Sequence, residues 1–368
     1  MAVAMGIGRF VYTPLLPGMM EGLGLSASDA GLIASANYAG YLVGAIVAAG
    51  NWGQGREYTA AMAALALTAV LSAAMGLTDN ILAFLAIRFV GGVASAFVMV
   101  FLTTIIFARL AQAGRGELQA WHFGGVGFGI AVSSLMTGAL LLAAAPWQAG
   151  WLWSGALAAA GFLVVLLLVD RGPVPAQKPM AEPAMPKTAA MTRIVVAYGL
   201  FGFGYIVTAT FLVAIVREGE AGRMFESVVW LVTGLAGLPS VWLWSMAARR
   251  YGLSAMFAFA CVVEAVGVAA SVAMHGHVGP IVAGVLLGGT FIAITAMGLQ
   301  IARRLAGEAP RRVLALMSAS FGLGQILGPV VAGLVADRTG SFTAPSLLAA
   351  GVLLIAAAVA FGVRPPDP

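Results

Sequence analysis

Residues 120–144 read AWHFGGVGFGIAVSSLMTGALLLAA and contain no Asp, Glu, Lys or Arg. An α-helix crosses a bilayer core of about 30 Å with roughly 20 apolar residues, so this stretch is long enough and apolar enough to span a membrane. Small residues such as Gly127, Gly129 and Gly138 let helix backbones approach one another closely in lipid. The stretch therefore predicts a membrane helix with a packing face.

The composition of the whole chain agrees with this prediction. The 368 residues are 61% hydrophobic and 9% charged, with a mean hydropathy of +0.99, whereas a soluble domain carries about 25% charged residues. Only helices and closed barrels satisfy every backbone polar group in hydrocarbon, and barrel strands would read as about 10 alternating residues. The apolar stretches here are much longer, so we predict an all-α integral membrane protein.

Twelve such stretches follow one another, each bounded by polar residues, glycine or proline. They cover residues 1–20, 28–50, 57–77, 80–108, 120–144, 147–169, 192–217, 224–247, 252–274, 278–302, 312–336 and 342–363. The first stretch has no basic segment before it and no small-residue cleavage site before Arg9, which argues against a signal peptide. We expect instead that the first helix begins before residue 1.

The basic residues predict the orientation, because Lys and Arg are enriched in short cytoplasmic loops. Of the 19 Lys and Arg residues, Arg9 and Arg88 lie inside spans, Arg217, Arg223 and Arg338 lie in loops on one side, and the other 14 lie on the opposite side. We therefore place both termini in the cytoplasm. The net charge of +5 follows from this topology and gives no reason to expect a nucleic-acid partner.

A polar stretch divides the twelve spans into two sets of six. Residues 170–191 hold five prolines and two lysines, a composition typical of a linker. We predict an N-terminal half at residues 1–169, a cytoplasmic linker at 170–191 and a C-terminal half at 192–368.

Three glycine patterns recur across this linker, at offsets of 196, 197 and 195 residues. The pairs are Gly6 and Gly8 with Gly202 and Gly204, Gly91 and Gly92 with Gly288 and Gly289, and Gly127, Gly129 and Gly138 with Gly322, Gly324 and Gly333. They lie on spans that correspond in a six-plus-six division. The pattern predicts two parallel repeats related by an axis along the membrane normal, with a binding site between them near the midplane.

Several motifs resemble those of the major facilitator superfamily (MFS). Residues 86–94 (AIRFVGGVA) are similar to its Arg-x-x-Gln-Gly motif, with Gly91 in place of the usual glutamine. Residues 324–329 and 336–340 (ADRTG) are also typical of that superfamily. The resemblance implies the MFS fold of twelve transmembrane helices.

A narrower resemblance is to the YbfB/YjiJ-type branch of the superfamily. Residues 6–17 (GIGRFVYTPLLP), 35–45 (SANYAGYLVGA) and 198–212 (YGLFGFGYIVTATFL) carry it. It implies a secondary transporter of the bacterial inner membrane and indicates no particular substrate.

Two motifs depart from the superfamily pattern. The loop after the second span normally reads Gly-x-x-x-Asp-Arg-x-Gly, but residues 50–57 (GNWGQGRE) lack the Asp, so the usual charge latch of the outward state is in doubt. The fifth span normally contains Gly-Pro, but the corresponding residues 132–135 read VSSL. Direction of transport therefore does not follow from these motifs.

Arg9 is the first candidate for a functional charge inside the membrane. An arginine near a helix centre costs roughly 2.5–3.5 kcal/mol on insertion scales, and such a residue is a functional hypothesis by default. Tyr12 and Thr13 share its helical face at i+3 and i+4, and a guanidinium offers a fork of donors suited to a carboxylate or phosphate. We predict that Arg9 and Tyr12 bind an anionic group of the substrate; the alternative is an arginine that snorkels or pairs locally.

Three further ionisable residues are candidates for coupling or gating. By resemblance, Arg88 takes the role of the motif arginine in the conformational or proton cycle, and its alternative is a structural ion pair. His122 is either a proton relay or an interfacial residue. Glu264 is either a packing residue or the one central carboxylate available for proton coupling.

Polar and aromatic residues complete the predicted binding site. They are Asn37, Tyr38 and Tyr41 on the second span, Tyr198, Tyr205 and Thr208 on the seventh, and Gln325 on the eleventh. For each, the alternative is a hydrogen bond that packs helices together. Tyr205 occupies the position of Arg9 in the second repeat, so the predicted site is asymmetric, with its positive charge on the N-terminal half.

We predict a secondary active transporter that moves a small organic anion by alternating access, because the predicted cavity helices carry arginines and no carboxylate. One alternative is a proton-coupled exporter of neutral or hydrophobic compounds, and another is a membrane sensor of the same fold that transports nothing. We expect a monomer in the lipid bilayer that uses a small-molecule substrate and, in the exporter alternative, a coupling proton. No catalytic or metal-binding constellation is apparent, since three histidines and one cysteine are scattered over the chain, so we expect no enzyme activity and no cofactor.

Overall fold

The computed structural model describes residues 1–50, 53, 55–171, 185–219, 222–274, 276–307 and 309–364, and regular structure in this part of the chain is entirely helical. In chain order the elements are the π-helix η1 (Ala2–Ile7), α1 (Tyr12–Leu23), α2 (Ala27–Ala48), α3 (Glu57–Met75), α4 (Ile81–Phe97), the π-helix η3 (Val98–Leu102), α5 (Thr103–Gln112), the 3₁₀-helix η4 (Gly116–Leu118), α6 (Gln119–Leu142), α7 (Trp147–Leu168), α8 (Ala189–Glu218), α9 (Arg223–Tyr251), α10 (Leu253–Ala273), α11 (Val278–Leu305), α12 (Pro310–Thr339) and α13 (Thr343–Ala360).

Eleven helices within the described ranges are long and apolar enough to cross a membrane. They correspond to the second to twelfth predicted spans, and α4, η3 and α5 form one helix over residues 81–112. The predicted all-α membrane fold is therefore confirmed.

The first predicted span, residues 1–20, is helical but irregular. It consists of η1 and α1, and residues 8–11 interrupt them. Pro14 has no N–H to donate to the carbonyl of Phe10, and this carbonyl accepts instead from Thr13 N at 3.2 Å. The regular hydrogen-bond pattern is thus interrupted one turn before the prolines, at the position of Arg9, while Gly8 and Val11 keep right-handed helical dihedrals. We call this interruption at residues 8–11 the break.

The predicted linker at 170–191 is too long at its C-terminal end. Helix α8 begins at Ala189, where the hydroxyl of Thr188 accepts a hydrogen bond from Met191 N at 3.1 Å and caps the helix. Residues 172–184 of that linker, and residues 51, 52 and 54 of the loop after α2, lie outside the described residues.

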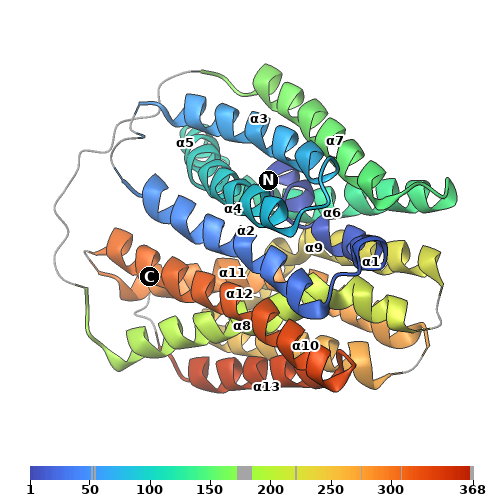
Figure 1. The fold of residues 1–368 in the computed structure, drawn as a ribbon. Coiled ribbons are helices and arrows are strands. Elements are labelled where there is room, and N and C mark those ends of the chain that lie inside the picture. The colour runs from blue at the N-terminus through green and yellow to red at the C-terminus, as the bar shows by residue number, and fades with distance from the viewer. Residues whose placement is uncertain are drawn as a thin grey trace.

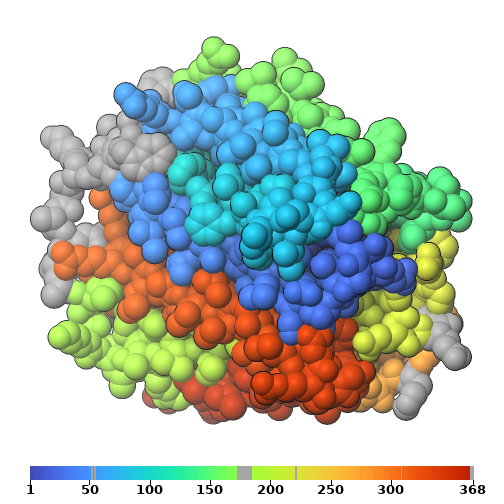
Figure 2. Space-filling model, viewed as in Figure 1, coloured from blue at the N-terminus to red at the C-terminus, as the bar shows by residue number. Residues whose placement is uncertain are grey.

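The helices of the two halves meet along two long seams. In Figure 1, α3, α4 and α7 lie in the upper part of the molecule and α8, α10 and α13 in the lower part, while α2 runs along α12 between them. Helix α6 packs in the same way along α9. Figure 2 shows the seam of α2 and α12 from outside, where blue and orange-red surfaces join closely.

The glycine repeat has a direct counterpart in the packing. Gly92 of α4 lies against the carbonyl of Asn37 in α2, and Gly288 of α11 lies against the carbonyl of Thr233 in α9. Both members of the second pair stand 196 positions after those of the first, since 37 plus 196 is 233 and 92 plus 196 is 288. The pairing of Gly91 with Gly288 predicted from the sequence is therefore wrong by one residue, and Gly92 is the counterpart of Gly288. In each half, therefore, a glycine at the equivalent position lets one helix backbone approach a carbonyl of the neighbouring helix.

A second repeated contact involves the first helix of each half. Gly6 packs against the backbone of Gly129 in α6, and Gly202 of α8 packs close to Gly324 of α12. In both halves the approach is too close for a side chain, which is how small residues tighten helix packing in lipid.

At the end where α1 finishes and α2 begins, which we call the outer end, polar contacts join the two halves. Asp337 of α12 accepts hydrogen bonds from the backbone N–H of Ala27 at 2.9 Å and of Ser28 at 3.0 Å, at the N-terminus of α2. A carboxylate is favourable there because the helix dipole and the free N–H groups both attract an anion.

An ion-pair cluster lies at the same end. Arg217 of α8 contacts Glu21 of α1 at 3.0 Å and the buried Glu226 of α9 at 2.6 Å, and Arg223 also contacts Glu21, at 3.1 Å. Since Glu21 belongs to the first half and its partners to the second, these contacts help to hold the halves together at the outer end.

We expect Gly288→Ala to destabilise the protein and Gly289→Ala, its neighbour on the same helix, to leave it unchanged or slightly more stable. A methyl group at Gly288 would clash with the backbone of Thr233, whereas nothing lies within 4 Å of one at Gly289. Overpacking costs about 1–3 kcal/mol, while alanine is about 1 kcal/mol better than glycine in a helix. Thermal unfolding in detergent measures both effects; equal melting temperatures for the two variants would contradict the packing described.

Candidate functional site

Arg9 lies in the break between η1 and α1 and is almost fully buried, with 3% of its surface exposed. Its guanidinium carbon lies 4.6 Å from the ring centre of Tyr38 and 4.9 Å from that of Tyr41, both on α2. Phe10 provides a third ring at 5.5 Å. The structure thus brings together three of the predicted binding residues, with the positive charge held on aromatic faces.

One edge of the Arg9 guanidinium has no hydrogen-bond partner among the described residues. The unpartnered buried atoms are Nε and Nη2, whose N–H bonds point in the same direction. This is an edge that a carboxylate engages with two parallel hydrogen bonds. No salt bridge joins Arg9 to an acid in the part of the chain that the structure describes.

Arg88 of α4 is buried to the same extent but is used differently. Its Nη1 donates to the carbonyl of Gly8 at 3.1 Å and its Nη2 to the carbonyl of Arg9 at 3.2 Å. Its guanidinium also stacks on Tyr12 at 5.0 Å and on Trp151 at 6.0 Å. Because Thr13 N donates to Phe10 and not to Arg9, Arg88 supplies donors that the broken helix does not.

Two other predicted residues support this arrangement. Asn37 donates from Nδ2 to the carbonyl of Arg88 at 2.9 Å, and the hydroxyl of Tyr12 donates to the carbonyl of Ala30 at 2.9 Å. Asn37 and Arg88 also line a cavity of about 10 Å³, the size of about one water molecule. These hydrogen bonds tie α1 and α4 to α2 beside the break.

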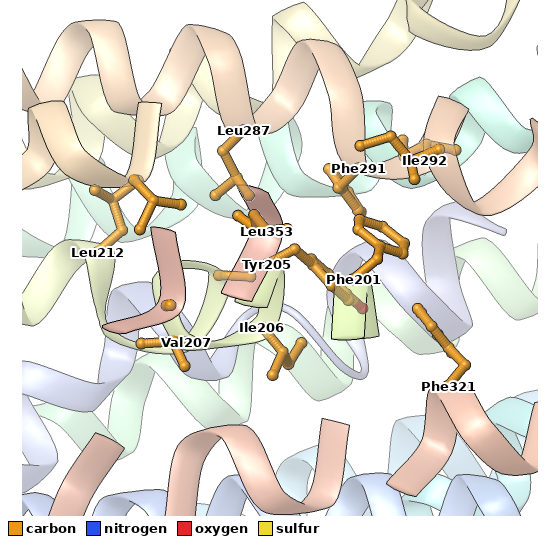
Figure 3. Packing of buried hydrophobic residues seen from close by; sticks show 14 of the residues in the cluster. Phe201, Tyr205, Ile206, Val207, Leu212, Leu287, Phe291, Ile292, Phe321 and Leu353 are labelled. Atoms are coloured by element: carbon orange, nitrogen blue, oxygen red, sulfur yellow. The ribbon is translucent and has the colours of Figure 1, made fainter. Parts of the chain in front are cut away.

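The C-terminal half contributes an aromatic wall. Tyr205 of α8 is nearly parallel to Phe291 of α11 and to Phe321 of α12, at 9° and 8°, with ring centres 5.8 Å away in each case. Figure 3 shows these rings together with Phe201, which stacks on Tyr205 at 4.9 Å. Tyr198 extends the wall by stacking on Phe321 at 4.8 Å.

Contacts between the halves place this wall next to the Arg9 segment. Phe10 meets Phe291 with ring centres 5.7 Å apart, and the hydroxyls of Tyr38 and Thr210 lie 3.3 Å from each other. Thr13 donates to the carbonyl of Ala209 at 2.5 Å. The free edge of Arg9 and the aromatic wall therefore belong to one central region.

Polar groups on the C-terminal side are partly satisfied. Gln325 of α12 donates to the hydroxyl of Tyr205, and Tyr198 donates to the carbonyl of Thr295 at 3.3 Å. The carbonyl oxygen of Gln325 and the hydroxyl of Thr208 are buried without a hydrogen-bond partner within the described ranges. Gln325 thus retains an acceptor in a region that is otherwise aromatic.

The other two predicted coupling residues lie on α6 and α10. His122, at the start of α6, has its Nε2 3.0 Å from the hydroxyl of Thr103 and packs among Phe107 and Phe123. Glu264 of α10 is 0% exposed, and neither carboxyl oxygen has a hydrogen-bond partner among the described residues. The hydroxyl of Thr290, from α11, lies near this carboxyl group but donates to the carbonyl of Leu286 at 2.6 Å.

Sequence reasoning missed the phenylalanines of the site, which are Phe10, Phe201, Phe291 and Phe321. In a chain with 19 phenylalanines, a buried ring and a lipid-facing ring have the same sequence signature. The spacing of Phe201 and Tyr205, one helical turn apart, was the available signal for part of the wall.

A family model described as "Uncharacterised MFS-type transporter YbfB" matches residues 1–361. No curated protein sequence matches the chain. The fold is similar to that of a mutant of the nucleoside transporter NupG, with a TM-score of 0.76 at 15% identity over 98% of this chain and 97% of that one.

Two further solved structures have the same overall fold. NupG itself gives a TM-score of 0.68 at 16% identity, covering 98% of both chains. A bacterial homolog of the human lysosomal transporter Spinster, in an inward-facing and occupied conformation, gives 0.70 at 13% identity over 98% of this chain and 94% of that one. At these identities the likeness concerns the fold alone.

Replacing Arg88 by alanine is expected to lower the melting temperature more than replacing Arg9 by alanine. Arg88→Ala leaves the carbonyls of Gly8 and Arg9 without these donors, and an unpaired buried polar group costs about 1–3 kcal/mol. Arg9→Ala removes a charge with one unpartnered edge. Thermal unfolding of the two purified variants in the same detergent makes the comparison. A lower melting temperature for Arg9→Ala would contradict the conclusion that Arg88, and not Arg9, stabilises the backbone at the break.

Proposed function

We propose that this chain, which belongs to the family of YbfB-type MFS transporters, moves a small organic anion across the membrane as a secondary active transporter. The family match covers residues 1–361 and makes the protein a multi-pass membrane transporter and not an enzyme. The anionic cargo is inferred from the chemistry of the central region.

The observation that carries this proposal is the free edge of Arg9. A guanidinium stays charged in proteins, and leaving such a charge buried without hydrogen bonds is costly. Nε and Nη2 of Arg9 have no partner in the described part of the chain, whereas Arg88 donates to two carbonyls and leaves only its Nε without a partner there. A bound carboxylate would satisfy both donors of Arg9 at once and neutralise its charge.

The surroundings favour an anion with a flat apolar body. Tyr38 and Tyr41 cover the guanidinium, and Tyr205, Phe291 and Phe321 form parallel rings on the opposite half. Aromatic pairs prefer offset-stacked or edge-to-face contacts, so a planar ring would pack well beside this wall. Aromatic carboxylates are therefore the first class of cargo to test.

Glu264 favours the second candidate function, a proton-coupled exporter of neutral or hydrophobic compounds. Its carboxyl group is fully buried and has no hydrogen-bond partner among the described residues, and an ionisable residue inside a membrane span is a functional hypothesis by default. The fold's likeness to a nucleoside transporter adds nucleosides as neutral compounds to test. Under the main proposal Glu264 remains a candidate for the coupling proton, with Arg88 and His122 as candidates for gating.

We also propose a location in the bacterial inner membrane with both termini in the cytoplasm. The 14-to-3 distribution of basic residues between the two sets of loops supports this orientation. The outer end, where Asp337 and the Arg217 cluster join the halves, would then face the periplasm. On this orientation, contacts at the periplasmic end hold the halves together.

We expect uptake of benzoate or cinnamate into proteoliposomes to be saturable for the wild type and strongly reduced for Arg9→Gln. Hydrogen bonds to a charged group contribute roughly 1.5–3 kcal/mol, so the apparent affinity is expected to fall at least about tenfold. Arg9→Lys keeps the charge but loses the bidentate geometry of the guanidinium. Its uptake should lie between that of the wild type and that of Arg9→Gln. Unchanged uptake in Arg9→Gln would overturn the proposal.

Glu264→Gln separates the cargo site from proton coupling. If Glu264 only couples a proton, this variant keeps exchange of labelled for unlabelled anion and loses accumulation driven by a pH gradient. Loss of nucleoside flux in Glu264→Gln, with no anion flux in the wild type, would establish the exporter alternative instead. No flux of any tested compound by folded wild-type protein would favour the sensor.

A further inference from the structure

A groove separate from the Arg9 region lies between the last turns of α9 and the first turns of α10. Its volume is about 590 Å³, within the range of about 300–1,000 Å³ that small-molecule pockets occupy. Every side chain that lines it is apolar or aromatic: Leu243, Trp244, Ala247, Tyr251, Met256 and Phe259.

The groove has a fixed floor and exposed walls. Trp244 donates from Nε1 to the carbonyl of Gly289 in α11 at 2.7 Å and packs against Phe259 with ring centres 5.9 Å apart. Tyr251 and Phe259 are 60% and 54% exposed. In a helix bundle surrounded by lipid, exposed apolar walls of this kind meet acyl chains.

Positive charge lies at one end of the groove. Arg249 and Arg250 are in the last turn of α9, next to Tyr251, and both are exposed. Arg250 is three residues from Ala247 and seven from Leu243, so it shares their face of the helix, and its guanidinium lies 5.4 Å from the ring centre of Tyr251.

No acid neutralises these two arginines in the sequence nearby. Residues 227–263 contain no Asp or Glu, and none of the salt bridges among the described residues involves Arg249 or Arg250. The groove therefore combines an apolar channel along the helices with an unneutralised pair of charges at the helix ends. Tyrosine and tryptophan at this level are typical of the membrane interface.

We propose that this groove binds an anionic phospholipid, with an acyl chain along Trp244 and Phe259 and the phosphate at Arg250. A phospholipid has this layout, since its phosphate lies at the level of helix ends and its chains run parallel to the helices. Basic sites between transmembrane helices bind anionic headgroups elsewhere. A zwitterionic lipid carries a cation beside its phosphate, which the Arg249 and Arg250 pair repels.

The test is native mass spectrometry of the delipidated full-length protein, titrated in detergent with dioleoyl phosphatidylglycerol or dioleoyl phosphatidylcholine. We expect phosphatidylglycerol to bind at least about tenfold more tightly, because each arginine contributes about 1 kcal/mol of attraction to a net anionic headgroup. Arg250→Gln should abolish this preference. Arg304→Gln, which removes an exposed arginine at the end of α11, is the control with the same net charge and should retain it.

A second measurement locates the acyl chain. Phosphatidylglycerol with dibrominated chains should quench the tryptophan fluorescence of the wild type more than that of Trp244→Phe, because bromine quenches only at short range. Equal affinity of the two lipids, an unchanged preference in Arg250→Gln, or equal quenching of wild type and Trp244→Phe would each overturn the proposal. Transport activity is not the readout, so failure here is distinguishable from failure of the anion proposal.

Discussion

The hydrogen bonds from Arg88 to the carbonyls of Gly8 and Arg9 are the interaction on which the central region depends. In hydrocarbon every backbone group needs a partner within the protein, and a broken helix leaves carbonyls without one. Arg88 supplies donors from a neighbouring helix, so the chain can leave the regular α-helical hydrogen-bond pattern at residues 8–11. Arg9 lies in this break beside Tyr38 and Tyr41, so one buried arginine satisfies backbone carbonyls while the other keeps two donors without a partner among the described residues.

The two halves share their packing and differ in their chemistry. Gly92 and Gly288 bring backbones together at equivalent positions, whereas Arg9 of the first half corresponds to Tyr205 of the second. Tyr205 contacts Gln325 and parallel rings, while one edge of Arg9 makes no hydrogen bond to any residue that the structure describes. A charge on one side and an aromatic wall on the other suit a cargo that has an anionic end and an apolar body.

Much of the fold could be predicted from the sequence, because apolar length and small-residue spacing are local properties. The break at Arg9 could be predicted only in part: Pro14 removes a backbone donor locally, but the donors that satisfy the carbonyls of Gly8 and Arg9 come from Arg88, about 80 residues away in the sequence. The aromatic wall could not be predicted from the sequence either, because the sequence does not distinguish Phe291 and Phe321 from lipid-facing rings. The sequence also nominated Arg9 with Tyr38 and Tyr41, which lie together in the structure. It nominated Asn37 and Tyr12 as well, whose side chains donate to backbone carbonyls.

The central claim is that the free edge of Arg9 receives the carboxylate of the cargo. An experimental structure of the protein with 4-bromobenzoate tests it most directly, since the bromine can be located by its anomalous signal. The account predicts carboxylate oxygens about 2.7–2.9 Å from Nε and Nη2 of Arg9, with the ring beside Tyr205 and Phe291. A carboxylate bound elsewhere, with both donors of Arg9 still unpartnered, would contradict it.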